Sequence, residues 1–151
     1  MNSIELKNTN LNETTIKQLI NSAITARTFS YAPYSHFNTG AALLTKDDKI
    51  YQGCNIENAA FSPTNCAERT AFFKAISEGN KEFKAIAIVG GSSNKGIEDY
   101  CPPCGVCRQV MLEFCDPNNF YIILAKSESD YKIYTLAQLM PLNFTNDKIN
   151  T

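Results

Sequence analysis

The chain has 151 residues, 44% of them hydrophobic and 19% charged, which predicts one folded domain over 1–151 with its core between about residues 10 and 140. The formal net charge of −1, without an arginine-rich stripe or a basic tail, argues against nucleic acid as a partner. No apolar run is long enough to cross a bilayer, and the N-terminus lacks the basic start and apolar centre of a secretory signal, so we expect neither a membrane partner nor secretion.

The first part of the chain predicts one helix and one hairpin. Apolar residues recur at helical spacing over residues 10–29, and Asn10 followed three positions later by Glu13 resembles a capping box. Residues 37–45 and 49–56 are extended segments joined by a polar turn, which is typical of a β-hairpin.

Helices alternate with apolar strands in the remainder of the chain. A helical stripe follows Asn65, which stands three residues before Glu68, and the stripe stops at Gly79. The other expected elements are a buried strand over 85–89, a helix over 104–114 that two prolines open, a buried strand over 121–125 and a short helix over 135–140. We expect Val106 and Met111 on the apolar side of the 104–114 helix.

This order of elements predicts an α/β fold with three layers, in which helices cover both faces of a mixed sheet of about five strands. The N-terminal helix comes first, the β-hairpin second, and alternating helices and strands complete the chain. Strand ends that lead into helix starts are where such folds usually place ligands. Two cysteine-containing segments fall at such junctions.

The six cysteines indicate a reducing compartment, the cytoplasm, in which clustered thiols bind metal more often than they form disulfides. Cys104 and Cys107 form a C-x-x-C in the first turn of a predicted helix, where both sulfurs can reach one ion. Cys66 lies at the start of the preceding helix, and a right-handed connection can bring the two helix starts together. Taken alone, the C-x-x-C pair also fits a redox-active site or a closed structural zinc site.

Three protein ligands leave the fourth tetrahedral position of zinc to water, which is the pattern of a catalytic site. The nearest spare thiol, Cys101, stands before two prolines that aim it away from the helix start. Glu68 can take the proton of the water that zinc acidifies, although a glutamate in a first helical turn is also stabilised by the helix dipole alone. Arg69 can offset the net negative charge of three thiolates and one zinc by donating to sulfur; an exposed arginine is the alternative.

The cysteine motifs resemble a known family. Residues 66–69 (CAER) and 103–109 (PCGVCRQ) resemble the paired zinc motif of the cytidine deaminase superfamily. Residues 32–37 (APYSHF), 40–44 (GAALL) and 53–59 (GCNIENA) are similar to the small homotetrameric, free-nucleoside cytidine deaminases, with continuous similarity from about residue 29 to 114. The resemblance implies a cytoplasmic homotetramer with one Zn²⁺ per subunit. It also implies hydrolysis of free cytidine and deoxycytidine to uridine and deoxyuridine, with release of ammonia, in pyrimidine salvage.

The resemblance further implies that Cys66, Cys104 and Cys107 bind the zinc. An activated water would attack C4 of the pyrimidine, and Glu68 would carry a proton first to N3 and then to the departing ammonia.

The implied substrate contacts are Phe37 against the ring, Asn55 and Glu57 on the sugar 3′-hydroxyl, and the backbone of Ala67 on the base edge. Phe61 and Phe144 are implied to reach the site of a neighbouring subunit. From the residues alone, Phe37 also fits a core aromatic. Asn55 and Glu57 are expected on one face of a strand, where they could simply be exposed.

Four alternatives remain. Polynucleotide-editing and deoxycytidylate deaminases typically carry histidine where this chain has Cys66, and the former also have basic grooves. A deaminase of aminonucleoside antibiotics shares the cysteine ligands. A non-catalytic, zinc-stabilised interaction module would fill the fourth zinc position with protein and leave Glu68 dispensable.

Overall fold

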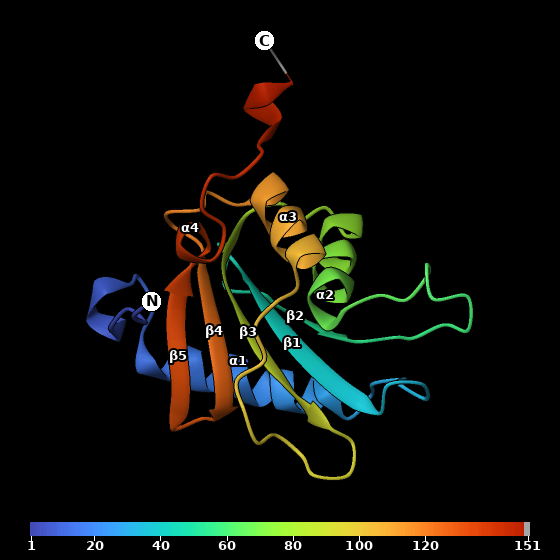
Figure 1. Ribbon diagram of the computed structural model, residues 1–151. Helices are drawn as coiled ribbons and strands as arrows, with labels where there is room; N and C mark the ends of the chain where they lie inside the picture. The colour runs from blue at the N-terminus through green and yellow to red at the C-terminus, as the bar shows by residue number, and fades with distance from the viewer. Residues whose placement is uncertain (150–151) are drawn as a thin grey trace.

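A mixed sheet of five strands organises the computed structural model, which describes residues 1–149 (Figure 1). The strands are β1 (Phe37–Thr45), β2 (Ile50–Cys54), β3 (Phe83–Ser92), β4 (Tyr121–Ser127) and β5 (Asp130–Thr135). Their order across the sheet is β2-β1-β3-β4-β5, with β3 and β4 parallel and all other neighbours antiparallel. The predicted α/β class with a mixed sheet of about five strands is confirmed.

Helices lie on both faces of this sheet, so the three-layer arrangement holds (Figure 1). The helices are α1 (Glu13–Arg27), α2 (Ala67–Ser77), α3 (Gly105–Phe114) and α4 (Leu136–Leu139), with short 3-10 helices at Leu6–Asn8 and Asn146–Lys148. One buried cluster lies under α1, around Leu19 and Ile123, and a second lies under α2 and α3, around Phe72 and Met111. Within residues 1–149, no helix combines the length and the hydropathy that a bilayer-spanning helix needs.

The first helix is shorter than predicted at both ends. Its N-cap is Asn12, not Asn10, and the Asn12 side chain accepts from the backbone N–H of Thr15 at 2.8 Å. The cap lies immediately before the first helical residue because its oxygen must reach the unpaired N–H groups of the first turn. The helix ends at Arg27, before the predicted end at residue 29.

Cys66, rather than Asn65, is the N-cap of α2, and its backbone is extended with φ of −77° and ψ of 158°. The Asn65 side chain instead donates to the hydroxyl of Thr70 at 3.2 Å. This placement matters for the site, because it puts the Cys66 sulfur at the tip of the helix and not inside its first turn.

Two further predictions differ from the structure, and one strand has no counterpart among the predicted elements. The predicted hairpin strand over 49–56 ends at Cys54, and the chain continues through isolated bridges at Ile56. The run 130–135 was not predicted as an element; it forms β5, an edge strand whose alternating polar residues are mostly half-buried. Val106 is 58% exposed, because the buried side of α3 is formed by Cys107, Met111 and Leu112.

Two glycines allow helices to approach the sheet closely on its two faces. A Cβ at Gly40 would stand 2.0 Å from the Ala23 carbonyl oxygen in α1, and a Cβ at Gly53 would stand 2.2 Å from the Ala67 carbonyl oxygen in α2. Because the obstructing atoms are backbone, they cannot move away by a change of rotamer. The close approach at Gly53 places the first turn of α2 directly on β2.

We therefore expect Gly40→Ala to lower the free energy of unfolding by about 1–3 kcal/mol, because the added methyl group pushes α1 off the sheet. Urea denaturation followed by circular dichroism measures this. Gly105→Ala is the matched control: a Cβ there meets nothing within 4 Å, so its effect should stay within about 1 kcal/mol. An unchanged urea midpoint for Gly40→Ala would contradict the close-packing explanation.

Candidate metal centre and active site

The N-terminal ends of α2 and α3 meet on the same face of the sheet, and each end carries cysteine. Cys66 is the N-cap of α2, Cys104 is the N-cap of α3, and Cys107 lies in the first turn of α3. The three Sγ atoms lie within 4.8 Å of one another, and those of Cys66 and Cys104 are 3.9 Å apart. The fold thus brings the Cys66 thiol, which lies 38 positions before Cys104 in the sequence, next to the C-x-x-C pair.

The spacing of the sulfurs fits zinc. Thiolate sulfurs about 2.3 Å from a tetrahedral zinc ion stand about 3.8 Å from one another, and the Cys66–Cys104 separation of 3.9 Å is close to that value. In the part of the chain that the structure describes, no fourth histidine, cysteine or carboxylate joins the group, and Cys101 stays outside it. A donor set of three sulfurs is that of a catalytic rather than a structural zinc site.

The three thiols lie in different electrostatic environments. Hydrogen bonds from Cys107 and Arg69 lower the pKa of Cys66 to about 5, against the opposing effect of burial. The hydrogen bond to Cys66 and burial raise the pKa of Cys107. Two helix N-termini favour negative charge here, and the Cys107 N–H donates to the Cys104 sulfur at 3.5 Å. Three adjacent thiolates require a cation to balance their charge.

Arg69 lies against the sulfurs and is not a freely solvated surface side chain. Its Nη2 donates to the Cys66 Sγ at 3.4 Å, and its Nε is buried with no hydrogen-bond partner within residues 1–149. A guanidinium in this position partly neutralises the thiolate cluster.

Glu68 is buried next to the cluster, with only 4% of its surface exposed. Burial raises the pKa of its carboxyl to about 7, and the negative charge of Cys66 adds to the increase. No lysine or arginine forms an ion pair with it in the described part of the chain. A buried carboxyl with a pKa near neutrality can both accept and donate a proton at physiological pH.

Phe37 begins β1 and is 43% exposed, so it is not a core aromatic. Its backbone is held on both sides: the N–H donates to the Ser35 Oγ at 3.1 Å, and the carbonyl accepts from the Asn55 Nδ2 at 2.8 Å. The ring lies beside Gly90 at the rim of a hollow of about 500 Å³, which Tyr100 also lines. The Phe37 backbone is therefore held by hydrogen bonds, while part of its ring remains exposed.

Asn55 and Glu57 lie beyond the end of β2, so the expectation that they share a strand face was wrong. The Asn55 Oδ1 accepts from the Thr39 N–H at 2.9 Å, which ties the residue to β1. The Glu57 Oε1 accepts from the backbone N–H groups of Tyr34 and Ser35, and hydrogen bonds from Ser35 lower the pKa of Glu57. Each side chain keeps capacity for a ligand: one N–H on the amide and the second carboxylate oxygen.

The remaining predicted site residues occupy three different places. Ala67 is fully buried at the start of α2, where its N–H has no partner inside the helix. Phe61 is 72% exposed on the loop between β2 and α2, which projects from the body of the fold (Figure 1), and its ring meets Tyr34 edge-on at 6.2 Å. Phe144 is 59% exposed on the C-terminal segment that extends beyond α3.

Sequence reasoning assigned no role to Arg108 and Gln109, although both belong to the PCGVCRQ motif. Arg108 donates to the carbonyl oxygens of Pro103 and Leu139, and the Gln109 side chain donates to the carbonyl oxygen of Phe144. The position of Arg108, one turn after Cys104, was the available signal.

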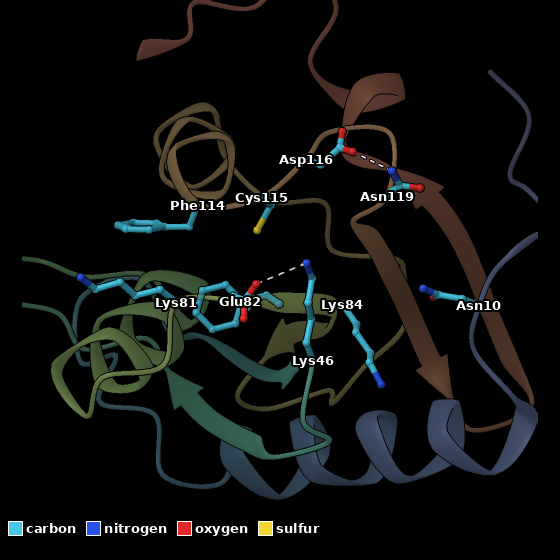
Figure 2. A pocket seen from close by; sticks show the side chains of 10 residues that line it. Asn10, Lys46, Lys81, Glu82, Lys84, Phe114, Cys115, Asp116 and Asn119 are labelled. Carbon is cyan, nitrogen blue, oxygen red and sulfur yellow. Dashed lines mark hydrogen bonds and ion pairs between the residues drawn. The ribbon is translucent and has the colours of Figure 1, made fainter. Parts of the chain in front are cut away.

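A hollow of about 520 Å³ lies away from this site, at the C-terminal end of α3 (Figure 2). Three lysines line it, Lys46, Lys81 and Lys84, and two of them form ion pairs: Lys46 with Glu82 at 3.6 Å and Lys84 with Asp48 at 2.6 Å. The carbonyl end of a helix also disfavours an anion. The hollow contains none of the predicted site residues.

Comparison with known proteins identifies the family. Residues 13–123 match the family described as the cytidine and deoxycytidylate deaminase zinc-binding region. A cytidine deaminase of Sporosarcina psychrophila is 46% identical over 135 residues, which cover 89% of this chain and 95% of that protein. The crystal structure of the cytidine deaminase from Burkholderia pseudomallei matches with a TM-score of 0.76 at 43% identity, covering 84% of this chain and 97% of that one.

The chain is therefore a zinc-site protein of the α/β deaminase class, and it belongs to the cytidine and deoxycytidylate deaminase family. The predicted resemblance and the predicted zinc cofactor are confirmed by the family match and by the sulfur cluster. The family also includes more distant relatives of other specificity: a blasticidin-S deaminase of Bacillus cereus is 30% identical over 135 residues, 86% of this chain and 92% of that protein.

We expect Cys104→Ala to weaken zinc retention at least about tenfold, because it removes one of three sulfur donors. Zinc per chain after dialysis against a mild chelator, determined by elemental analysis, measures this. Cys101→Ala is the matched control, since Cys101 is a nearby cysteine outside the cluster. Equal zinc content in the two variants would remove Cys104 from the metal site.

Proposed function

We propose that this protein hydrolyses free cytidine and deoxycytidine to uridine and deoxyuridine, with release of ammonia, in pyrimidine salvage. The observation that carries the proposal is the buried carboxyl of Glu68 beside three cysteine sulfurs at the meeting point of two helix N-termini. Relatives named cytidine deaminase at 46% identity support the same activity.

In this proposal Cys66, Cys104 and Cys107 hold one Zn²⁺ per subunit. When bound, zinc supplies Lewis acidity that lowers the pKa of water from 15.7 to about 7. Arg69 donates to the Cys66 sulfur, and this contact withdraws negative charge that would oppose ionisation of the water.

Glu68 is the proposed proton carrier. Its carboxylate accepts a proton from the attacking water and passes it to N3 of the pyrimidine while the oxygen bonds to C4. It then takes the proton of the new C4 hydroxyl and delivers it to the 4-amino group, so that the C4–N bond breaks and ammonia leaves. A carboxyl whose pKa is about 7 suits both directions of transfer.

The proposed substrate contacts are made by exposed groups of residues that hydrogen bonds within the protein hold in place. Phe37 packs against the pyrimidine ring, and its backbone is fixed by Ser35 and Asn55. The free amide N–H of Asn55 and the second carboxylate oxygen of Glu57 bind the sugar 3′-hydroxyl. The unpaired backbone N–H of Ala67 reads the base edge.

The charge of Glu57 favours a free nucleoside over a polynucleotide. Its pKa is lowered, so the carboxylate is ionised at neutral pH. A carboxylate on the 3′-hydroxyl would repel the 3′-phosphate of an internal nucleotide. The net charge of −1 agrees with a substrate that is not nucleic acid. Aminonucleoside antibiotics are the second candidate substrate class, because a blasticidin-S deaminase is among the relatives.

The proposed assembly is a cytoplasmic homotetramer of a single domain over residues 1–151, with no nucleic-acid or membrane partner. The rings of Phe61 and Phe144 are exposed, so both are accessible to a neighbouring subunit. We propose that both residues reach the site of a neighbouring subunit. None of the six cysteines forms a disulfide, which agrees with the proposed reducing compartment.

The decisive experiment follows the ultraviolet absorbance change of cytidine, deoxycytidine, deoxycytidylate, blasticidin S and single-stranded DNA. We expect turnover of the first two. Glu68→Gln should lower turnover by about 10²- to 10⁴-fold while zinc content is retained, because the amide cannot carry the proton. Wild-type turnover in this variant would disprove the assigned role, and turnover of blasticidin S alone would replace the proposed substrate.

The shared site can be tested by complementation. We expect wild-type protein to elute as four chains in size-exclusion chromatography with light scattering, and Phe61→Ala and Glu68→Gln each to be impaired. Co-expressed, the two variants should recover activity in mixed tetramers, because some sites then combine an intact Glu68 with an intact neighbouring Phe61. An active monomer, or no recovery in the mixture, would exclude a site completed by Phe61 of another subunit.

A further inference from the structure

The segment that delivers Cys104 to the cluster has little structure of its own. Between the end of β3 at Ser92 and the start of α3 at Gly105, residues 97–104 form neither helix nor strand. Pro102 and Pro103 have no backbone N–H, so they cannot anchor the segment by donating hydrogen bonds. Cys104 itself is held as the N-cap of α3, where its carbonyl oxygen accepts from the Arg108 N–H at 3.0 Å, whereas the residues before it depend on contacts from outside the segment.

Packing and hydrogen bonds from other elements provide such contacts, and Ile97, Tyr100 and Cys101 pack against the two buried clusters. The Tyr100 hydroxyl donates to Asp130, and the Cys101 thiol forms a hydrogen bond with the Thr39 side chain. Next to the ligand itself, the anchor is Arg108: its Nε donates to the Pro103 carbonyl oxygen at 2.8 Å. Pro103 is buried, so this carbonyl needs a partner inside the protein.

The same guanidinium reaches a second element. Its Nη1 donates to the Leu139 carbonyl oxygen at 2.6 Å, and Leu139 is the last residue of α4. That carbonyl is one of the groups that a helix leaves unpaired at its C-terminus. Arg108 thus joins the residue before Cys104 to a helix beyond β5, and it forms no ion pair within residues 1–149. Its hydrogen bonds go to backbone.

We propose that Arg108 is a positioning residue for the zinc ligand Cys104: its planar fork holds the Pro103 carbonyl against the end of α4 and so fixes the sulfur of the next residue within the cluster. The inference rests on the proposed zinc site. A lysine would not replace it, because a single ammonium group on a flexible stem cannot hold the two carbonyls in the fixed geometry of the fork.

Arg27 is a matched control within the same chain. It is also a half-buried arginine devoted to backbone carbonyls, donating to those of Asn38 and Gly91 at 2.9 Å and of Ser92 at 3.0 Å. Its bonds tie the end of α1 to β1 and β3 and not to the residues beside the sulfur cluster. Its removal should cost fold stability without loosening the metal site.

The test measures zinc release from the zinc-loaded protein into excess chelator, together with the thiolate-to-metal absorption bands of the cobalt-substituted form. We expect Arg108→Ala and Arg108→Lys to release zinc about 10- to 100-fold faster than wild type, with shifted cobalt bands. Arg27→Ala should release zinc at the wild-type rate and keep the wild-type spectrum.

Three results would overturn the inference. Wild-type release from Arg108→Ala would show that the contact does not hold the ligand. Wild-type release from Arg108→Lys would show that charge and not geometry is what matters. Equal acceleration in Arg27→Ala would reduce the effect to general destabilisation. Wild-type protein that binds no zinc would refute the proposed function itself, which separates the two failures.

Discussion

The structure depends on one electrostatic constraint, the need to hold three sulfur ligands within 4.8 Å of one another. Thiolates at that spacing repel, and the protein offsets this by placing them at two helix N-termini and by setting Arg69 against Cys66. The offset is partial: the pKa of Cys66 is lowered, whereas that of its neighbour Cys107 is raised. A cation completes the balance, which is why the donor set is a metal site and not simply a cluster of free cysteines.

The same packing that presents the sulfurs also sets the chemistry of Glu68. Its helix lies on β2 through the close approach at Gly53, so the first turn of α2 is held against the sheet and its carboxyl is buried. Burial opposes the charged form and moves the pKa towards neutrality. Position and proton affinity therefore have a common cause in the close contact between helix and strand.

Two of the residues that we propose to bind substrate, Asn55 and Glu57, are held in place by hydrogen bonds to backbone groups. Asn55 forms hydrogen bonds with the backbone of β1, and Glu57 accepts from two backbone N–H groups of the loop before β1. One amide N–H of Asn55 and one carboxylate oxygen of Glu57 remain for a ligand. A group that is already fixed by its own protein loses less conformational freedom when it binds a ligand. The predicted roles of these residues and their structural roles are thus compatible, although the sequence indicated only the former.

The sequence was most informative where a local rule governs the structure. The bounds of β1 match the extended segment predicted before the polar turn, and the C-x-x-C lies at a helix start, as the two prolines before it predict. Prediction failed where neighbours in space decide the outcome. Val106 has an apolar side chain yet lies outside the packing face of α3, and β5 forms because β4 offers an edge to pair with. The N-caps, Asn12 and Cys66, lie two positions and one position after the predicted caps Asn10 and Asn65.

By itself, the sequence indicated the α/β class, the candidate cysteines and carboxylate, and the family, because the order of the elements and the CAER and PCGVCRQ motifs are local patterns of residue types. Only the tertiary structure decided which side chains surround them. The burial of Glu68, the approach of the Cys66 sulfur to that of Cys104 and the hydrogen bond from Arg108 to Leu139 depend on elements that are far apart in the sequence. Burial and long-range hydrogen bonds depend on how distant elements pack, and no local pattern specifies that packing.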